Sequence, residues 1–79
     1  MFYQIKYSPN CLDQNIIKLF NNCKYSISLC LENKIIEIKP NEKYNINLES
    51  EDSCEIILLR NYTKFILNKG IVMYFYSDL

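Results

Sequence analysis

The sequence contains no histidine, no tryptophan and no alanine, and it has only one glycine. Without histidine, the usual base that activates a serine or cysteine nucleophile is missing. A single glycine also excludes the glycine-rich loops that hold phosphate groups. Paired carboxylates such as Glu49 and Glu55 could in principle hydrolyse a glycosidic bond, but the sequence gives no indication of the concave pocket that this reaction requires. We therefore expect no enzymatic activity and no cofactor.

Neither sign of charge is in excess, because nine Lys and Arg residues balance nine Asp and Glu residues. This balance argues against a large basic footprint for nucleic acid, and it weakens the repulsion between copies of the chain. The four cysteines, Cys11, Cys23, Cys30 and Cys54, have long and irregular gaps that do not match a zinc knuckle. We interpret them as small buried residues or incidental thiols and expect no metal site.

Long hydrophobic runs are also missing, since no segment approaches the ~18 apolar residues that cross a membrane. Residues 1–7 do not show the basic and apolar regions of a secretory signal. We expect a cytoplasmic protein with reduced cysteines and no membrane partner. At 79 residues and 49% hydrophobic content, the chain has room for one core, so we expect a single domain over residues 1–79.

Four abundant residue types have AT-rich codons, with twelve Ile, ten Asn, eight Lys and seven Tyr. We interpret this bias as the mark of an AT-rich genome, such as that of a low-GC bacterium or of its phage or plasmid. It concerns nucleotide composition rather than function.

Apolar and polar residues alternate from Tyr25 to Tyr76, which is the period of a β-strand. The breaks fall on turn sequences: Glu32-Asn33, Pro40-Asn41-Glu42, and Asn68-Lys69-Gly70 with the single glycine. Between such breaks we predict strands over 2–7, 25–31, 36–39, 44–49, 55–59, 65–67 and 71–76.

Residues 11–21 allow two interpretations. Asn10 is a good helix cap, and a helix would bury Leu12, Ile16, Leu19, Phe20 and Cys23 on one side. The β-branched pair Ile16-Ile17 instead fits a strand over 16–20. We favour the helix and keep the strand as the alternative.

The predicted fold class is mainly β. If the short N-terminal helix forms, the class is instead β-rich α+β. The fold is a small antiparallel sandwich or open barrel of about six to seven strands. The last three segments are apolar on both faces, which indicates either central strands or a surface that a partner covers.

Two groups of residues are candidates for partner binding. The first is an exposed, largely aromatic patch of Tyr62, Ile66, Val72, Tyr74 and Tyr76, since tyrosine buries a large ring and keeps a hydroxyl for hydrogen bonding. The alternative is that these residues are simply core. The second group is an acidic cluster that suits a basic surface: Glu49, Glu51, Asp52 and Glu55. The alternative for this cluster is a solvated loop.

A nucleic-acid interface is the second functional class, because small β barrels stack single-stranded bases on aromatic residues between cations. The residues for it are Arg60, Tyr62, Lys64, Tyr74 and Tyr76.

Residues 27–48, with the Glu32-Asn33 turn and the corner Ile38-Lys39-Pro40-Asn41-Glu42-Lys43-Tyr44, resemble hairpins of PEGA-type surface-associated β-sandwich modules. The glycines usual at the turns of such modules are absent here, and the resemblance implies no function.

We predict a small protein-protein interaction module without chemistry of its own, of the kind that a phage or plasmid encodes as an inhibitor to mask a larger host complex. The partner is another protein or a second copy of the chain, for example in a homodimer. The alternatives are a single-stranded nucleic-acid binder, which the charge balance makes less favoured, and a homo-oligomeric structural subunit.

Overall fold

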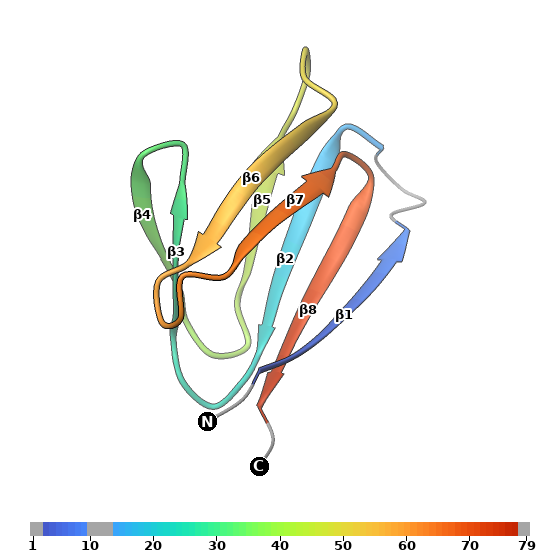
Figure 1. The fold of residues 1–79 in the computed structure, drawn as a ribbon. Coiled ribbons are helices and arrows are strands. Elements are labelled where there is room, and N and C mark those ends of the chain that lie inside the picture. The colour runs from blue at the N-terminus through green and yellow to red at the C-terminus, as the bar shows by residue number, and fades with distance from the viewer. Residues whose placement is uncertain (1–2, 10–13, 78–79) are drawn as a thin grey trace.

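A computed structural model describes residues 3–9 and 14–77 of the chain. These residues form eight strands and no helix (Figure 1). The strands are β1 (Tyr3–Pro9), β2 (Ile16–Asn22), β3 (Ile27–Leu31), β4 (Lys34–Ile38), β5 (Lys43–Asn47), β6 (Ser53–Leu58), β7 (Lys64–Asn68) and β8 (Ile71–Ser77). The mainly β fold class that the alternation predicts is confirmed.

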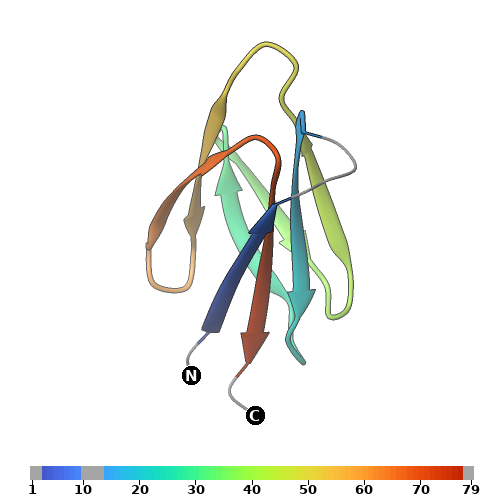
Figure 2. The ribbon, with the colours of Figure 1, turned by 90° about the vertical axis from the view of Figure 1, so that its right-hand side faces the viewer.

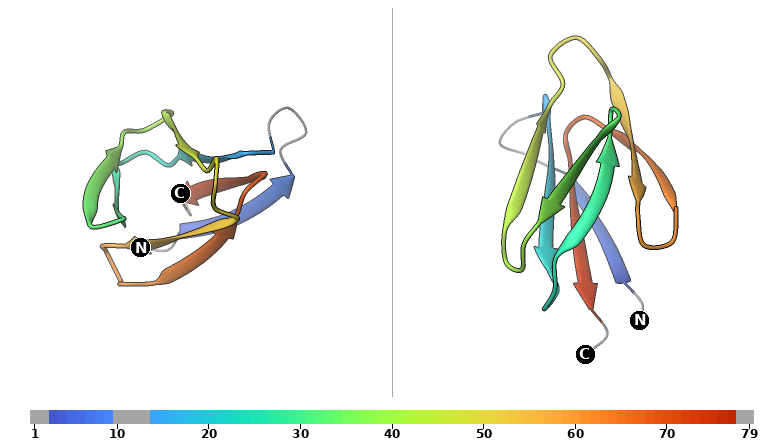
Figure 3. Two further views of the ribbon diagram at one scale, coloured as in Figure 1. Left: turned by 90° about the horizontal axis from the view of Figure 1, so that it is seen from above. Right: turned by 90° about the vertical axis from the view of Figure 1, so that its left-hand side faces the viewer.

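The strands build two four-stranded sheets that form an open sandwich rather than a closed barrel. The first sheet has the order β1-β8-β2-β5, and the second has the order β4-β3-β6-β7. Neighbouring strands are antiparallel except for β2 and β8, which are parallel. Seen from the left-hand side of Figure 1, the green β3–β4 hairpin lies in front of β2 and β8 (Figure 3, right).

Alternate residues of both sheets point into one shared core. The inner strands β2, β3, β6 and β8 supply side chains that are at most 2% exposed: Ile17, Leu19, Ile27, Leu29, Ile56, Leu58, Met73 and Phe75. Burying each of these large side chains stabilises the fold by about 1.5 to 3 kcal/mol. Because side chains alternate along a strand, the residues between them form two outer faces, one on each sheet.

The first and last strands lie side by side. β1 and β8 run in opposite directions, so the start of β1 and the end of β8 lie at the same end of the molecule (Figure 2). In register, Tyr3 lies opposite Ser77 and Ile5 lies opposite Phe75. Ile5 packs against the core, which confirms the strand predicted for the N-terminal segment.

The prediction of a helix over residues 11–21 is wrong where the structure describes these residues. Residues 16–22 form β2, as in the alternative interpretation. β2 explains why the described residues form eight strands where about six to seven are predicted. Ile17 and Leu19 point inward, whereas Ile16 and Phe20 lie on the outer face. Apolar residues on both faces of a strand imitate the spacing of a helical stripe. Asn10, Leu12 and Asp13 lie outside the described residues.

The predicted turns occur where expected, but two of them do not make hairpins. Glu32 and Asn33 have φ angles of 49° and 65° and close the β3–β4 hairpin, as a two-residue turn requires. Asn41 has a φ of 65°, yet the turn leads from β4 in one sheet to β5 in the other. Gly70, with a φ of 83°, likewise lies in a crossing between β7 and β8. Its amide donates a hydrogen bond to the Ile16 carbonyl oxygen at 3.1 Å.

Candidate functional site

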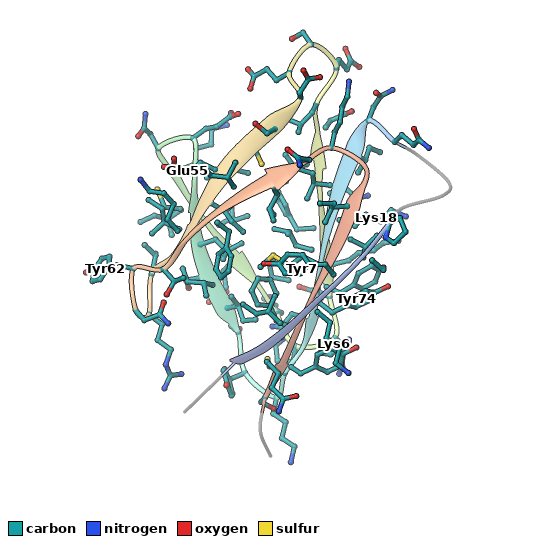
Figure 4. The ribbon with its side chains drawn as sticks, turned by 45° about the vertical axis from the view of Figure 1, so that its right-hand side comes forward. Lys6, Tyr7, Lys18, Glu55, Tyr62 and Tyr74 are labelled. Atoms are coloured by element: carbon teal, nitrogen blue, oxygen red, sulfur yellow. The ribbon has the colours of Figure 1, made fainter. Side chains whose placement is uncertain are left out.

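The structure does not bring the five residues of the predicted aromatic patch together. Tyr74 and Tyr76 lie half-buried on the outer face of the first sheet, in phase with Val72, which is only 6% exposed. Ile66 lies on the outer face of the second sheet, and Tyr62 lies in the β6–β7 turn of that sheet. Tyr74 and Tyr62 are accordingly seen on opposite sides of the molecule in Figure 4.

Tyr62 is the most exposed of these residues and has an unusual backbone. Its side chain is 79% exposed, and its φ angle is 57°. This left-handed conformation costs a bulky residue roughly 1 to 2 kcal/mol. The turn is held by the Thr63 amide, which donates to the Asn61 Oδ1 atom at 3.1 Å, and by the Leu58 amide, which donates to the Thr63 carbonyl oxygen at 2.9 Å.

The acidic cluster divides as well. Asp52 forms an ion pair of 3.3 Å with Lys69, and its carbonyl oxygen accepts a hydrogen bond from the Lys69 amide. Glu51 and Glu55 instead line a hollow of 410 Å³ on the second sheet. Glu49 lies in the β5–β6 connection and does not contribute to this hollow.

The hollow joins these carboxylates to an apolar row that sequence reasoning missed. Across the second sheet, Ile35 of β4 lies opposite Cys30 of β3, which in turn lies opposite Ile57 of β6. Ile66 continues the apolar surface beside Glu55. The hollow is lined by residues of this surface and by three carboxylates: Cys30, Ile57, Ile66, Glu32, Glu51 and Glu55, with Asn33, Ser53 and Cys54.

We call this surface the acidic face and define it by Cys30, Glu32, Ile35, Glu37, Glu51, Glu55, Ile57 and Ile66. Ile35 is 72% exposed and Ile66 is 69% exposed, each on an edge strand. Lys64 also lies beside it, with its Nζ atom 3.8 Å from a carboxylate oxygen of Glu55. Burial raises the pKa of the Cys54 thiol, and the nearby carboxylates of Glu32 and Glu51 raise this pKa further. The negative charge of the acidic face therefore acts on Cys54.

The outer face of the first sheet has the opposite character. We call it the basic face and define it by Lys6, Lys18, Phe20, Lys43, Tyr74 and Tyr76. The rings of Phe20 and Tyr74 are stacked, with centroids 5.3 Å apart and an interplanar angle of 17°. Tyr74 and Tyr76 are stacked with centroids 6.3 Å apart. Lys6 places its Nζ atom 5.5 Å from the centroid of the Tyr76 ring. Lys6, Lys18 and Tyr74 lie on the same side of the molecule in Figure 4.

The set predicted for nucleic acid is split between the two sheets. Lys64 begins β7, and Arg60 and Tyr62 lie in the turn before it, whereas Tyr74 and Tyr76 lie on β8 of the other sheet. Arg60 places its guanidinium carbon 6.0 Å from the centroid of the Tyr25 ring. Of this set, only the two tyrosines belong to the basic face. The strand period alone gives no way to pair them with Phe20, because the two strands are far apart in the sequence.

Two of the described cysteines are buried, as the sequence interpretation expects. Cys23 and Cys54 are 2% and 7% exposed, and Cys30 is half-buried on the acidic face. Burial raises the pKa of Cys23 as well as that of Cys54. Cys11 lies outside the described residues.

Comparisons with protein-family models, with curated proteins and with solved structures gave no match for this chain. In the part of the chain that the structure describes, no helix is long and apolar enough to cross a membrane.

Proposed function

We propose that this chain is a protein-binding module without catalytic chemistry, and that it binds its partner through the acidic face. The observation that supports this most directly is the exposure of Ile35 and Ile66 on either side of the half-buried Ile57. Large aliphatic side chains this exposed gain free energy when a partner covers them, by about 25 cal/mol for each Å² of apolar surface. Their grouping with Cys30 gives a continuous apolar centre.

The carboxylates indicate what kind of partner fits. Glu32, Glu51 and Glu55 lie around the apolar centre, and Glu37 lies along the β4 edge. A protein surface with an apolar middle and Lys or Arg around it would complement this arrangement, since rim charges mainly set orientation and association rate. The partner class is therefore a basic protein surface. A module that covers such a site acts as an inhibitor without any chemistry of its own, and this is the role that we propose.

The test compares the wild-type chain with an Ile35→Thr/Ile66→Thr variant. Threonine keeps a high β propensity and leaves the charge unchanged, so the fold should persist while the apolar centre is lost. Light scattering after size exclusion, with absorbance read at 260 and 280 nm, gives the oligomeric state first. If the wild type is a dimer and the variant is a monomer, the partner is a second copy of the chain.

If both are monomers, each is immobilised and exposed to extract of the source organism. The proposal expects a retained protein that the Ile35→Thr/Ile66→Thr variant loses and that a Lys6→Gln/Lys18→Gln control keeps, since the control changes only the opposite sheet. The retained protein is then purified, and the variant should bind it at least about tenfold more weakly. Equal retention by wild type and variant would contradict the proposal.

A further inference from the structure

The basic face carries one row of side chains that crosses all four strands of the first sheet. In register, Lys6 of β1 lies opposite Tyr74 of β8, and Tyr74 lies beside Phe20 of the parallel strand β2. Phe20 in turn lies opposite Lys43 of the edge strand β5. The row thus has a cation at each end and two stacked rings in the middle, and it spans about 14 Å from β1 to β5.

The neighbouring rows extend the same chemistry. On one side, Gln4, Tyr76 and Asn22 lie in register, and on the other side Lys18 lies between Val72 and Asn45. Tyr76 adds a third ring, and Lys18 adds a third cation. The uncharged polar residues of these two rows are three amides and a hydroxyl, which donate and accept hydrogen bonds without bringing charge: Gln4, Asn22, Asn45 and Ser8.

In the described part of the first sheet, carboxylates lie beside the strands rather than on them. At the described outward positions of β1, β2, β5 and β8 there is no Asp or Glu. Glu42 precedes Lys43, but its Oε1 atom accepts a hydrogen bond from the Lys39 backbone amide at 3.3 Å. With Glu37, it lines a hollow that Phe20 and Lys43 of the basic face also line, so two carboxylates border the basic face at this end of β2 and β5. The described outward positions of the first sheet therefore carry three lysines and no carboxylate, whereas cations and carboxylates lie together on the second sheet, as in the ion pair of Lys64 and Glu55.

We propose that the basic face binds single-stranded nucleic acid. The lysines would contact the phosphates, and the exposed parts of the three rings would stack against unpaired bases, a combination that single-strand binders use. A row about 14 Å long can contact only a few nucleotides of an extended single strand. A duplex keeps its bases paired and stacked, so the rings would have nothing to contact. A neutral polysaccharide would use the rings but not the three lysines.

This inference does not rest on the proposed protein-binding function, because it uses the other sheet. The first experiment measures fluorescence anisotropy of labelled oligo-dT and oligo-U of about 16 nucleotides, a length within the known site sizes. A duplex of the same length is measured beside them. Binding to the single strands that exceeds binding to the duplex is expected. No binding to either single strand, or a preference for the duplex, would overturn the proposal.

Salt dependence then tests the lysines. Three phosphate contacts give a slope near −2 in log K against log salt, or roughly 20-fold weaker binding at 200 mM than at 50 mM. The Lys6→Gln/Lys18→Gln/Lys43→Gln variant should bind more than about tenfold more weakly and lose most of this slope. The matched control is Lys34→Gln/Lys64→Gln/Lys69→Gln, which removes the same charge elsewhere and should keep the wild-type slope. Equal losses in both variants would show a general charge effect and overturn the site.

The rings are tested with Tyr74→Leu, which removes the aromatic ring but keeps an apolar side chain. Loss of one stacking contact should weaken binding by about fivefold or more. Tyr62→Leu removes an exposed ring in the β6–β7 turn and should bind as the wild type does. If Tyr74→Leu also binds as the wild type does, the surface attracts polyanions in general and single-strand recognition is overturned. Circular dichroism confirms that each variant folds, and Ile35→Thr/Ile66→Thr should retain full nucleic-acid binding.

Discussion

The side-chain amide of Asn21 donates a hydrogen bond of 2.8 Å to the backbone carbonyl oxygen of Ile38, and this bond joins the two sheets. Asn21 lies on β2 of the first sheet, whereas Ile38 ends β4 of the second. The same Nδ2 atom donates to the Tyr25 carbonyl oxygen at 2.9 Å, and Oδ1 accepts from the Cys23 amide at 2.8 Å. The residue is fully buried, so one amide satisfies three backbone groups away from water.

Replacing Asn21 should therefore destabilise the protein strongly. Asn21→Leu removes both donors and the acceptor, and leaving a buried polar group unpaired costs about 1 to 3 kcal/mol. We expect a loss of about 3 kcal/mol or more, which is a large part of the stability of a chain this small. Urea denaturation gives the free energy of unfolding. Asn22→Leu, at the exposed next position, is the matched control and should change it by less than about 1 kcal/mol. Similar losses at both positions would contradict this role for Asn21.

The fold class and the turns could be read from the sequence, because alternation and turn chemistry are local properties. Glu32-Asn33 illustrates this, since Asn tolerates the positive φ that the turn needs. The partition of strands between sheets could not be predicted. A two-residue link such as Lys69-Gly70 suits a hairpin, but here it crosses between the sheets. For this reason Ile66 and Tyr74, close in sequence, were assigned to one patch although they lie on opposite outer faces.

The basic face was hidden for a related reason. Phe20 resembled a buried helical residue, and its outward position becomes understandable only beside Tyr74, its parallel neighbour on β8. Net charge also concealed it, because a balanced total does not show how Lys and Glu are distributed over two sheets. The acidic face was partly found, through Ile66, Glu51 and Glu55. Ile35 does not follow from the sequence, because it precedes the strand predicted over 36–39 and the pair Ile35-Ile36 interrupts the alternation.

The β3–β4 turn offers a stabilising substitution. Glu32 and Asn33 both have positive φ angles, and the sequence Asn-Gly is the preferred one for such a turn. Glu32→Asn/Asn33→Gly should raise the free energy of unfolding by about 0.5 to 1 kcal/mol, because relief of the positive-φ cost outweighs the extra unfolded-state entropy of glycine. Thermal denaturation at neutral pH measures this as a higher Tm. Asn47→Gly, placed within β5, should have the opposite effect, because glycine weakens a strand. If the turn variant melts below the wild type, the assigned turn geometry is wrong.

The buried thiols should make stability depend on pH in the alkaline range. Burial raises the pKa of Cys23 and of Cys54, so the folded chain keeps these protons to a higher pH than the unfolded chain does. Their contribution is complete below roughly pH 8.5, the unfolded value, and is lost as the pH rises through the folded pKa values. Urea denaturation under reducing conditions between pH 7 and pH 10 should show this decline in stability. A Cys23→Val/Cys54→Val variant should decline less steeply, and parallel curves for the two proteins would refute the assignment.

The stacked pair of Phe20 and Tyr74 should couple β2 to β8 energetically. These strands are parallel neighbours, and their rings lie 5.3 Å apart at 17°, an offset arrangement that contributes about 0.5 to 1.5 kcal/mol beyond simple burial. A double-mutant cycle with Phe20→Leu and Tyr74→Leu isolates this contribution, because leucine keeps most of the apolar area. We expect the sum of the two single-mutant losses in the free energy of unfolding to exceed the loss of the double mutant by that amount. A pair without contact, Tyr62 and Tyr74, should give strictly additive losses. If Phe20 and Tyr74 were also additive, the rings would not act as a preorganised row, and the basic face would have to order them when a ligand binds.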